Sequence, residues 1–447
     1  MAPWPTWKAC ALPLESAAFP TVSWSHLVAA LPALSRKVRL ALPCIGLDAL
    51  GHGLLEMGWD NFEVSYAYDV DSALRGPLTA LHGSCVARSF QLGRPEGDIM
   101  NVDFTLWDRV DMVVSGPPCP PWSAIGRRQG AADWREAVFA QVTNIIVDQA
   151  HRGCYAFVSE MVPGIDDARP GGQESYLAEW LRGLSARAPM LRVFPWLMNS
   201  SEYLPQHRIR FYIVGVHWPL VQGTPLPPRL PPRAAAARAS LRDVLHVGLP
   251  PRDEGRLEPV SRRNLNAWKR IAAQYHRRDS GLVAILSVDR DPDMRFGSLN
   301  RYDGLAPALR THNELLWVYI LDRHGTLLVS RCLHPVERLA LQGFRPKVAD
   351  FLSKSALVRI TGNAFSVPVV TAVVRECFML LASRRVLGVP NVDLNVNAWL
   401  SDSELEAHSR KRRRMNIARS KLAVIERRVA ILTRRAKDAG HEGESLH

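Results

Sequence analysis

Short apolar runs rich in β-branched and aromatic residues recur along the first half of the chain, and helix-length segments separate them. Strands buried on both faces of a sheet have this continuous apolar character, and the intervening segments are long enough for crossover helices. The pattern predicts an open α/β sheet of the doubly wound type, built from parallel strands, with ligands bound at their carboxyl ends. The runs are Val38–Pro43, Phe62–Tyr68, Val110–Ser115, Tyr155–Ser159 and Ile209–Val216.

Length and composition limit the class of protein. The 447 residues, 47% of them hydrophobic, suffice for one large folded domain and a smaller one. The seven cysteines form no Cys-x-x-Cys pair, which argues against a disulfide framework or a metal site and for a reducing compartment. No apolar run reaches the length of a membrane span, so we expect no membrane partner.

The net charge of +13 is concentrated at the C-terminus, where residues 410–447 hold 12 Lys or Arg and 4 Asp or Glu. A basic excess is expected of a protein that meets phosphate backbones, although basic tails also direct localisation. The run Arg410–Arg414 suggests nuclear import if the source is eukaryotic, and otherwise we expect a cytoplasmic protein. An organellar destination stays open because Glu15 is the one acidic residue before Asp48.

Composition divides the chain into five parts. They are an N-terminal extension (1–36), the large α/β domain (37–216), an Arg-rich irregular segment (217–330) with a proline-rich linker (223–233), a return to the large domain (331–390), and a basic helical tail (391–447). Apolar residues from Met415 to Leu432 follow 3-4-3-4-3 spacing, which suits either docking of the tail on the protein's own body or a short coiled coil.

The most informative stretch runs from Val113 to Gly130, where an apolar strand enters a turn rich in Pro and Gly. Such a turn has a rigid backbone, so Cys119 is presented at the carboxyl end of the strand. A lone cysteine is more often a small buried hydrophobe. The flanking prolines and the following Arg127 and Arg128 favour a reactive thiol in a mobile basic loop instead.

Two further elements carry charged residues next to strands. Glu160 ends an apolar strand and would lie beside Cys119 if the two strands are neighbours, although a Glu at such a place is more often solvated or a helix cap. Gln206, Arg208 and Arg210 alternate as the chain enters another strand, so their side chains share one face, and the guanidinium groups can bind phosphate or orient a base.

These elements, in this order, resemble the motifs of the DNA (cytosine-5) methyltransferase family. The resembling stretches are Gly116–Cys119 for the nucleophile motif, Glu160–Val162 for the Glu-Asn-Val motif, Gln206–Arg210 for the Gln-x-Arg-x-Arg motif, Arg331–Phe344 for the ninth motif and Gly362–Pro368 for the tenth. Each is moderate support alone, but five in the family's order make coincidence very improbable.

The resemblance implies S-adenosylmethionine as cofactor and assigns residues to it. Asp69 would accept the ribose hydroxyls, Val70 would lie against the adenine, and Asp98 would accept from the adenine amino group. The other residues that the resemblance assigns to the cofactor are Ile45, Gly46, Leu47, Ile99, Pro118, Asn363 and Ala364.

The sequence departs from the family pattern in three places. Phe-x-Gly-x-Gly of the first motif is Cys44–Asp48 here, which keeps Gly46 alone, and Gly51 and Gly53 offer a shifted register. Pro120 stands where the family often has Gln. Met161 stands where it usually has Asn, which suggests slower turnover but removes neither nucleophile nor acid.

The resemblance also implies a mechanism in which the thiolate of Cys119 adds to C6 of a flipped cytosine, Glu160 stabilises protonated N3, and Arg208 and Arg210 hold the base or nearby phosphate. The expected partner is double-stranded DNA, read by the segment 217–330. Two alternatives stay open: an RNA (tRNA) cytosine-5 methyltransferase, and a catalytically weak DNA-binding or scaffold protein. The oligomeric state is open.

Overall fold

The computed structural model describes residues 19–383 apart from short gaps. The gaps are 33, 35, 83–89, 120–134, 168, 170–172, 222–229, 232–237, 250–253, 255–256, 279, 290, 293–299 and 312–314. Internal contacts divide the chain into two units, Met1–Pro390 and Asn391–His447. The predicted basic helical tail is the second unit, which lies outside the described residues.

A seven-stranded sheet organises the first unit, in the order β3-β2-β1-β4-β5-β7-β6. The first five of these strands in the chain run parallel, whereas β7 is antiparallel to both β5 and β6. The strands are β1 (Val38–Pro43), β2 (Phe62–Asp69), β3 (Phe90–Leu92), β4 (Met112–Ser115), β5 (Ala156–Met161), β6 (Leu191–Asn199) and β7 (Ile209–His217).

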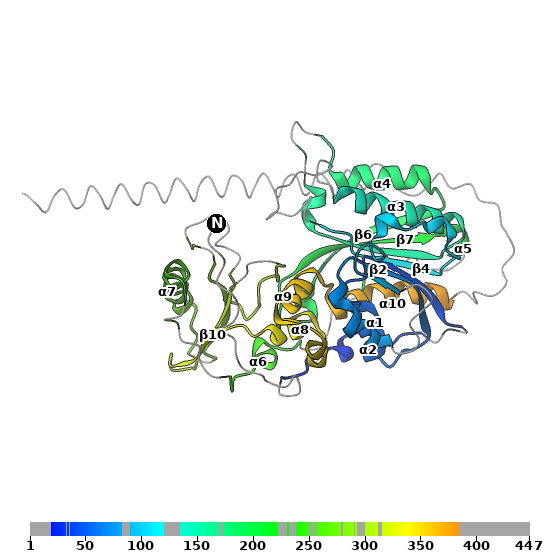
Figure 1. Cartoon of the computed structure of the whole chain (residues 1–447). Helices are drawn as coiled ribbons and strands as arrows, with labels where there is room; N and C mark the ends of the chain where they lie inside the picture. Colours follow the sequence, from blue (N-terminus) through cyan, green and yellow to red (C-terminus); the bar gives the residue numbers. More distant parts are fainter. Residues whose placement is uncertain are drawn as a thin grey trace, which may run out of the picture. The chain divides into compact units, whose positions relative to one another are not determined.

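Helices cover both faces of this sheet (Figure 1). On one face, helices α1 (Ala49–Glu56), α2 (Arg75–His82) and α10 (Val367–Ser383) pack against a large apolar cluster. On the other face, α3 (Glu136–His151) and α4 (Tyr176–Arg187) bury a second cluster. This three-layer arrangement confirms the predicted doubly wound α/β class, because both faces of the sheet are covered.

The predicted strands are found, but the prediction that all of them run parallel is wrong. The run Ile209–Val216 forms β7, and its register pairs Glu160 with Tyr212 and Met161 with Phe211 in antiparallel fashion. The start of β7 therefore lies beside the carboxyl end of β5. A parallel β7 would have put its first residues at the opposite edge of the sheet.

The segment predicted to be irregular contains regular elements. A three-stranded antiparallel sheet forms from β8 (Leu282–Ser287), β9 (Leu316–Leu321) and β10 (Leu327–Cys332). Trp268 of α7 (Pro259–Ala273) packs against one face of this sheet, and the short helices α5 (Trp218–Val221) and α6 (Leu241–Val244) precede α7. This small sheet gives the segment its own apolar core.

After β10 the described part of the chain continues through three α-helices. They are α8 (Pro335–Gln342), α9 (Lys354–Asn363) and α10. Within the part of the chain that the structure describes, no single helix has the length and hydropathy of a membrane span. The pair α9 and α10 meets those limits together with a bend of 41°. The apolar side chains of both helices pack in the large cluster.

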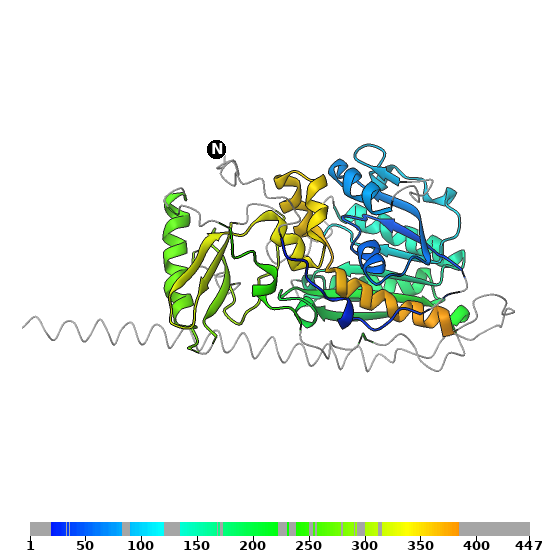
Figure 2. The same cartoon turned by 90° about the horizontal axis from the view of Figure 1, so that it is seen from below.

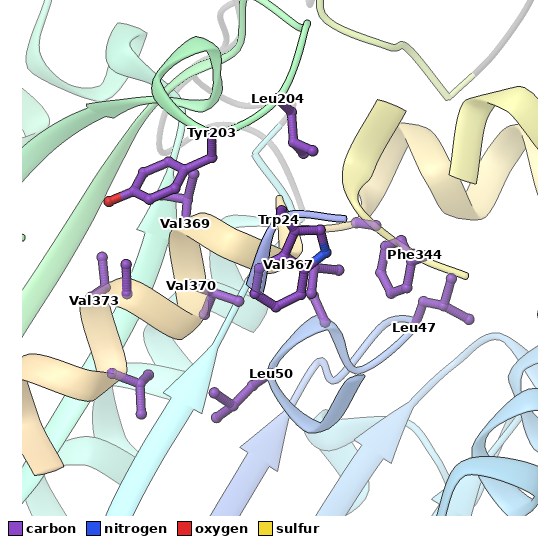
Figure 3. Close-up of a cluster of buried hydrophobic side chains, with 14 of the residues drawn as sticks. Trp24, Leu47, Leu50, Tyr203, Leu204, Phe344, Val367, Val369, Val370 and Val373 are labelled. Carbon is purple, nitrogen blue, oxygen red and sulfur yellow. The ribbon is translucent and has the colours of Figure 1, made fainter. Parts of the chain in front are cut away.

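The N-terminal segment runs along α10 and completes the core (Figure 2, dark blue beside orange). Arg375 of α10 donates to the carbonyl of Ala30 at 3.0 Å. The indole Nε1 of Trp24 donates to the carbonyl of Gly343, which ends α8, at 2.9 Å. Figure 3 shows Trp24 among Leu47 of the β1–α1 turn, Phe344 and the valines that begin α10. One buried indole thus joins three segments far apart in the sequence.

Replacing Trp24 should therefore destabilise the whole first unit. Trp24 is 1% exposed, so Trp24→Ala leaves a large cavity and loses a hydrogen bond. We expect the free energy of unfolding in urea to fall by about 3–5 kcal/mol. The control is Leu106→Ala, whose side chain is 80% exposed, with an expected change within about 0.5 kcal/mol. Equal effects of the two substitutions would contradict this role of Trp24.

Candidate active site

The catalytic candidates meet where β4 and β5 end. These strands are parallel neighbours, with Val113 paired to Phe157 and Ser115 to Ser159, so their carboxyl ends share one edge of the sheet. Cys119 follows β4 by four residues and is half-buried, and its Sγ lies 3.4 Å from the carbonyl of Pro117. Glu160 lies near the end of β5. The two residues lie at the same edge of the sheet, as predicted, because β4 and β5 are neighbouring strands.

Two arginines hold the Glu160 carboxylate, which is 3% exposed. Arg210 Nε lies 2.9 Å from Glu160 Oε1, and Arg208 Nη2 lies 3.5 Å from the same oxygen. Both arginines come from the start of β7, which reaches this edge because β7 is antiparallel to β5. A buried carboxylate is costly without such partners, so the two cations make the position of Glu160 tenable.

Arg208 also ties the site to the far end of the chain. It is 3% exposed and donates to the carbonyl of Ala364 at 3.0 Å and to that of Gly362 at 3.4 Å. Gly362 has no room for a side chain, since a Cβ would lie 2.4 Å from the backbone of Arg310. The guanidinium therefore links β5, β7 and the turn after α9.

The charges of this cluster act on one another. Burial, together with the charge of Glu160, raises the pKa of the Cys119 thiol to about 12, although Arg210 and Arg208 oppose the rise. Burial and the charge of Arg210 lower the pKa of Arg208 to about 10, against the opposing effect of Glu160. The reactive form of a cysteine is the thiolate, so the buried surroundings of Cys119 oppose its reactive form.

Two aromatic residues at this edge were not predicted. Phe365 packs over Gly116, where a Cβ would lie 2.4 Å from its ring. Tyr212 is the cross-strand partner of Glu160, and its ring centroid lies 6.4 Å from that of Phe365. Tyr212 does not stand out in the sequence because it belongs to an apolar run, whereas Phe365 lies inside the stretch Gly362–Pro368 without being assigned a role. Gln206 is fully buried, and its amide has no hydrogen-bond partner among the described residues.

Several of the residues assigned to the cofactor lie in or next to the turn between β1 and α1. Gly46 has a left-handed backbone (φ 55°) and open space above its Cα. Its N–H donates to Asp69 Oδ2 at 2.9 Å, and the N–H of Asp71 donates to Asp69 Oδ1 at 2.9 Å. Burial raises the pKa of Asp69 to about 6, although these two hydrogen bonds oppose the rise.

The side chains of the remaining cofactor candidates differ in their exposure to solvent. Val70 is 47% exposed and Asn363 is also exposed, so both side chains are available to a ligand. Asp98 is half-buried and accepts from the N–H of Met100 at 3.2 Å. Ile45 and Pro118 are half-buried. The side chains of three further candidates are buried in the protein, which leaves only their backbone for a ligand: Leu47, Ile99 and Ala364.

These groups fit S-adenosylmethionine. Asp69 is a half-buried carboxylate at the end of β2, where the first strands of a doubly wound sheet hold a ribose. An exposed apolar side chain, Val70, follows it for an adenine ring. The bare Cα of Gly46 leaves room for a ligand to approach the backbone closely. Among the described residues, no three His, Cys, Asp or Glu side chains gather as a metal site would require.

The structure excludes the shifted register of the first motif. Gly51 and Gly53 lie inside α1 and serve packing. A Cβ on Gly51 would lie 2.2 Å from Asp48 Oδ2, and one on Gly53 would lie 1.8 Å from Thr371 Oγ1 of α10. The loop that faces Asp69 is therefore Cys44–Asp48, as the unshifted register predicted.

Met161 lies on the other side of β5 from the charged cluster. It is fully buried in the apolar cluster under α3 and α4, and Phe211, its cross-strand partner, is buried there too. The departure from Asn thus changes packing beneath the site and leaves the contacts of Glu160 in place.

Some residues and segments with predicted roles lie outside the described part of the chain. These residues and segments are Pro120, the basic loop with Arg127 and Arg128, most of the linker 223–233 and the tail 391–447.

The chain is similar to known methyltransferases. The family described as C-5 cytosine-specific DNA methylase matches residues 47–379. Type II methyltransferase M.BanI of Aneurinibacillus aneurinilyticus is 27% identical over 167 residues, which are 37% of this chain and 36% of that protein. Type II methyltransferase M.MspI of Moraxella sp is 23% identical over 301 residues, 64% of this chain and 60% of that protein. The chain thus spans about a third of M.BanI and less than two thirds of M.MspI.

Solved structures of methyltransferases are also similar to this chain, at lower identity. A DNMT2 mutant of Spodoptera frugiperda has a TM-score of 0.48 at 16% identity, covering 76% of this chain and 100% of that one. A putative DNA modification methyltransferase from an E. coli prophage has a TM-score of 0.48 at 16% identity, covering 77% and 99%. The family match over residues 47–379, which contains the whole cluster around Glu160, shows that the chain belongs to the C-5 cytosine-specific DNA methylases.

Proposed function

We propose that the chain methylates C5 of cytosine in double-stranded DNA, with S-adenosylmethionine as methyl donor and Cys119 as a transient covalent nucleophile. The observation that carries this proposal is the cluster at the carboxyl edge of the sheet, where Cys119 lies within the electrostatic reach of Glu160, Arg208 and Arg210. A thiol, an acid and fixed cations are the groups needed to activate an electron-poor ring.

The Cys119 thiolate attacks C6 of the base, which converts C5 into an enamine carbon. Glu160 carries the proton shared with N3, so the negative charge that forms on the ring is neutralised. When bound, S-adenosylmethionine supplies an electrophilic methyl group that C5 accepts. Transfer of the C5 proton to solvent water then returns electrons to the ring, the bond between C6 and Sγ breaks, and the thiolate leaves.

The arrangement around Glu160 explains how the thiol is activated. In the proposed complex, Glu160 shares a proton with N3 of the base. The shared proton lessens the negative charge that raises the pKa of Cys119, while Arg208 and Arg210 remain to favour the thiolate. Substrate binding and nucleophile activation are coupled through one carboxyl group.

The DNA substrate is supported by the family description and by charge. The matched family consists of DNA methylases, and the relatives M.BanI and M.MspI are named as type II methyltransferases. The segment 217–330 is our candidate for the target recognition domain. Its exposed guanidinium groups suit phosphate or guanine edges, and they include Arg263, Arg270, Arg277 and Arg278.

A covalent adduct on fluorinated DNA tests the proposal most directly. Fluorine at C5 cannot leave as a proton, so elimination is blocked and the thiolate stays attached to C6. With S-adenosylmethionine present, a denaturation-resistant complex should form on DNA containing 5-fluorocytosine, and peptide mapping should place it at Cys119. Cys119→Ser should form no complex but still bind DNA, because phosphate contacts supply most of that affinity.

The outcomes of this experiment separate the alternatives. Fluorinated RNA of the same sequence is the parallel substrate, and an adduct on RNA alone would keep the mechanism but overturn the DNA assignment. Full methylation by Cys119→Ser would overturn the mechanism. Cofactor binding without any methylation of either substrate would indicate a scaffold protein.

The coupling of Glu160 to the thiol gives a second prediction. In Glu160→Gln the negative charge is gone, so the pKa of Cys119 should fall below about 12 and the thiolate fraction at pH 8 should rise. Alkylation of Cys119 by iodoacetamide, followed by peptide mapping, should become up to about tenfold faster for each unit of that fall. Glu63→Gln, an exposed site on β2, is the control. An unchanged alkylation profile would argue against the coupling.

The raised pKa of Asp69 predicts a pH-dependent cofactor affinity. Ribose hydroxyls donate to the charged carboxylate, so protonation of Asp69, whose pKa is about 6, should weaken binding as the pH falls through that value. By calorimetry, the affinity for S-adenosylmethionine should be about tenfold weaker at pH 5 than at pH 7.5. Asp69→Asn should bind weakly at both values. A wild-type affinity that does not change with pH would refute this role of Asp69.

A further inference from the structure

The turn between β1 and α1 has an unusual backbone. Cys44, Gly46 and Asp48 have φ angles of 58°, 55° and 48°, so left-handed residues alternate through the turn. Glycine adopts this region without cost, whereas a residue with a Cβ is strained there. Position 48 is where the family's first motif has its second glycine. The aspartate at this position therefore needs contacts that offset the cost of its left-handed backbone.

Two contacts hold the Asp48 side chain, which is 2% exposed. Its Oδ1 accepts from the N–H of Gly51 at 2.9 Å, which caps the start of α1. Its Oδ2 lies 2.7 Å from His82 Nε2, in the last turn of α2. Burial alone would raise the pKa of Asp48, but the hydrogen bond and charge of His82, with smaller effects of Gly51 and His52, lower it overall. A charged carboxylate is thus clamped between two helices.

Hydrogen bonds connect Asp48 to the residues assigned to the cofactor. The N–H of Asp48 donates to the carbonyl of Ile45 at 3.2 Å, and the N–H of Ile45 donates to the carbonyl of Tyr68 at 3.1 Å. Between them, the N–H of Gly46 donates to Asp69 at 2.9 Å. A change in the backbone at Asp48 would therefore move Gly46 relative to the Asp69 carboxylate.

We propose that His82 is a positioning residue for the cofactor: it fixes Asp48, and thereby holds the turn 44–48 in the left-handed shape that a glycine would adopt unaided. The proposal rests on the proposed function, because it takes S-adenosylmethionine as the ligand of this turn. His82 lies outside every stretch that carries the family resemblance, on a helix that contributes no other cofactor candidate. The aspartate at 48 and the histidine at 82 depend on each other.

Three variants of the full chain test this dependence, with S-adenosylmethionine as the titrant in calorimetry. His82→Leu leaves a buried carboxylate without its partner and should weaken the affinity about tenfold, the effect of one lost charged hydrogen bond. His82→Gln keeps a side-chain N–H donor and should stay within about threefold of wild type. The double variant Asp48→Gly with His82→Leu restores a residue that accepts positive φ, so most of the lost affinity should return.

The control variant is His324→Leu, at an exposed position in the turn between β9 and β10, which should not alter cofactor affinity. An affinity of His82→Leu equal to that of wild type would overturn the proposal, even if thermal unfolding shows a less stable protein. A double variant as weak as His82→Leu would overturn it too, because backbone strain at Asp48 would not be what His82 offsets.

A second readout separates this proposal from the proposed function. Wild-type protein that does not bind S-adenosylmethionine would contradict the proposed function. The role of His82 would then be decided by amide hydrogen exchange at Gly46, which reports opening of the turn. Exchange should be faster in His82→Leu and slow again in the double variant. Equal exchange in all three proteins would overturn the proposal.

Discussion

The antiparallel direction of β7 is the constraint on which the candidate site depends. Arg208 and Arg210 lie at the start of this strand, and Glu160 lies at the end of β5. Only an antiparallel pairing brings a strand's beginning to its neighbour's end. With a parallel β7, as predicted, the two arginines would lie at the opposite edge of the sheet from Glu160. In the structure β7 is antiparallel to β5, and both arginines lie next to Glu160.

Burial makes this cluster cooperative. Glu160 and Arg208 are each 3% exposed, so removing either one would leave its partner charged in a medium that solvates it poorly. Arg208 also satisfies the carbonyl of Ala364, which closes the turn after α9. Arg208 thus contributes, with Arg210, to the position of Glu160 and to the charges around Cys119, and it also holds the end of α9.

The sequence predicted the elements whose signal is local. β1 matches its predicted bounds, and β2, β4, β5 and β7 differ by one or two residues at their ends. β6 was not predicted, because Pro195 and polar residues interrupt its apolar pattern. A proline is tolerated there since β6 is the edge strand and pairs with β7 alone. The apolar runs of β8 and β9 are typical of strands, but the two strands were not predicted because the surrounding segment is rich in arginine.

Contacts between distant segments escaped prediction for a physical reason. Trp24 donates to Gly343 across 319 positions of sequence, and no local pattern encodes such a partner. The same holds for Phe365, which covers Gly116, and for His82, which meets Asp48. The motif residues Cys119, Glu160, Arg208 and Arg210 could be named in advance, because their chemistry and order are visible in one dimension. The residues that position them could not.

The departures from the family pattern differ in physical kind. Met161 is a change on the buried side of β5, where an apolar side chain suits its surroundings better than an amide would. Asp48 brings a charge and a strained backbone into the turn beside Asp69, and both need compensation. That compensation is visible in the cap on Gly51 and in the contact with His82. A motif that looks degraded in sequence can thus keep its shape, because the structure replaces the freedom of a glycine with contacts from a neighbouring helix.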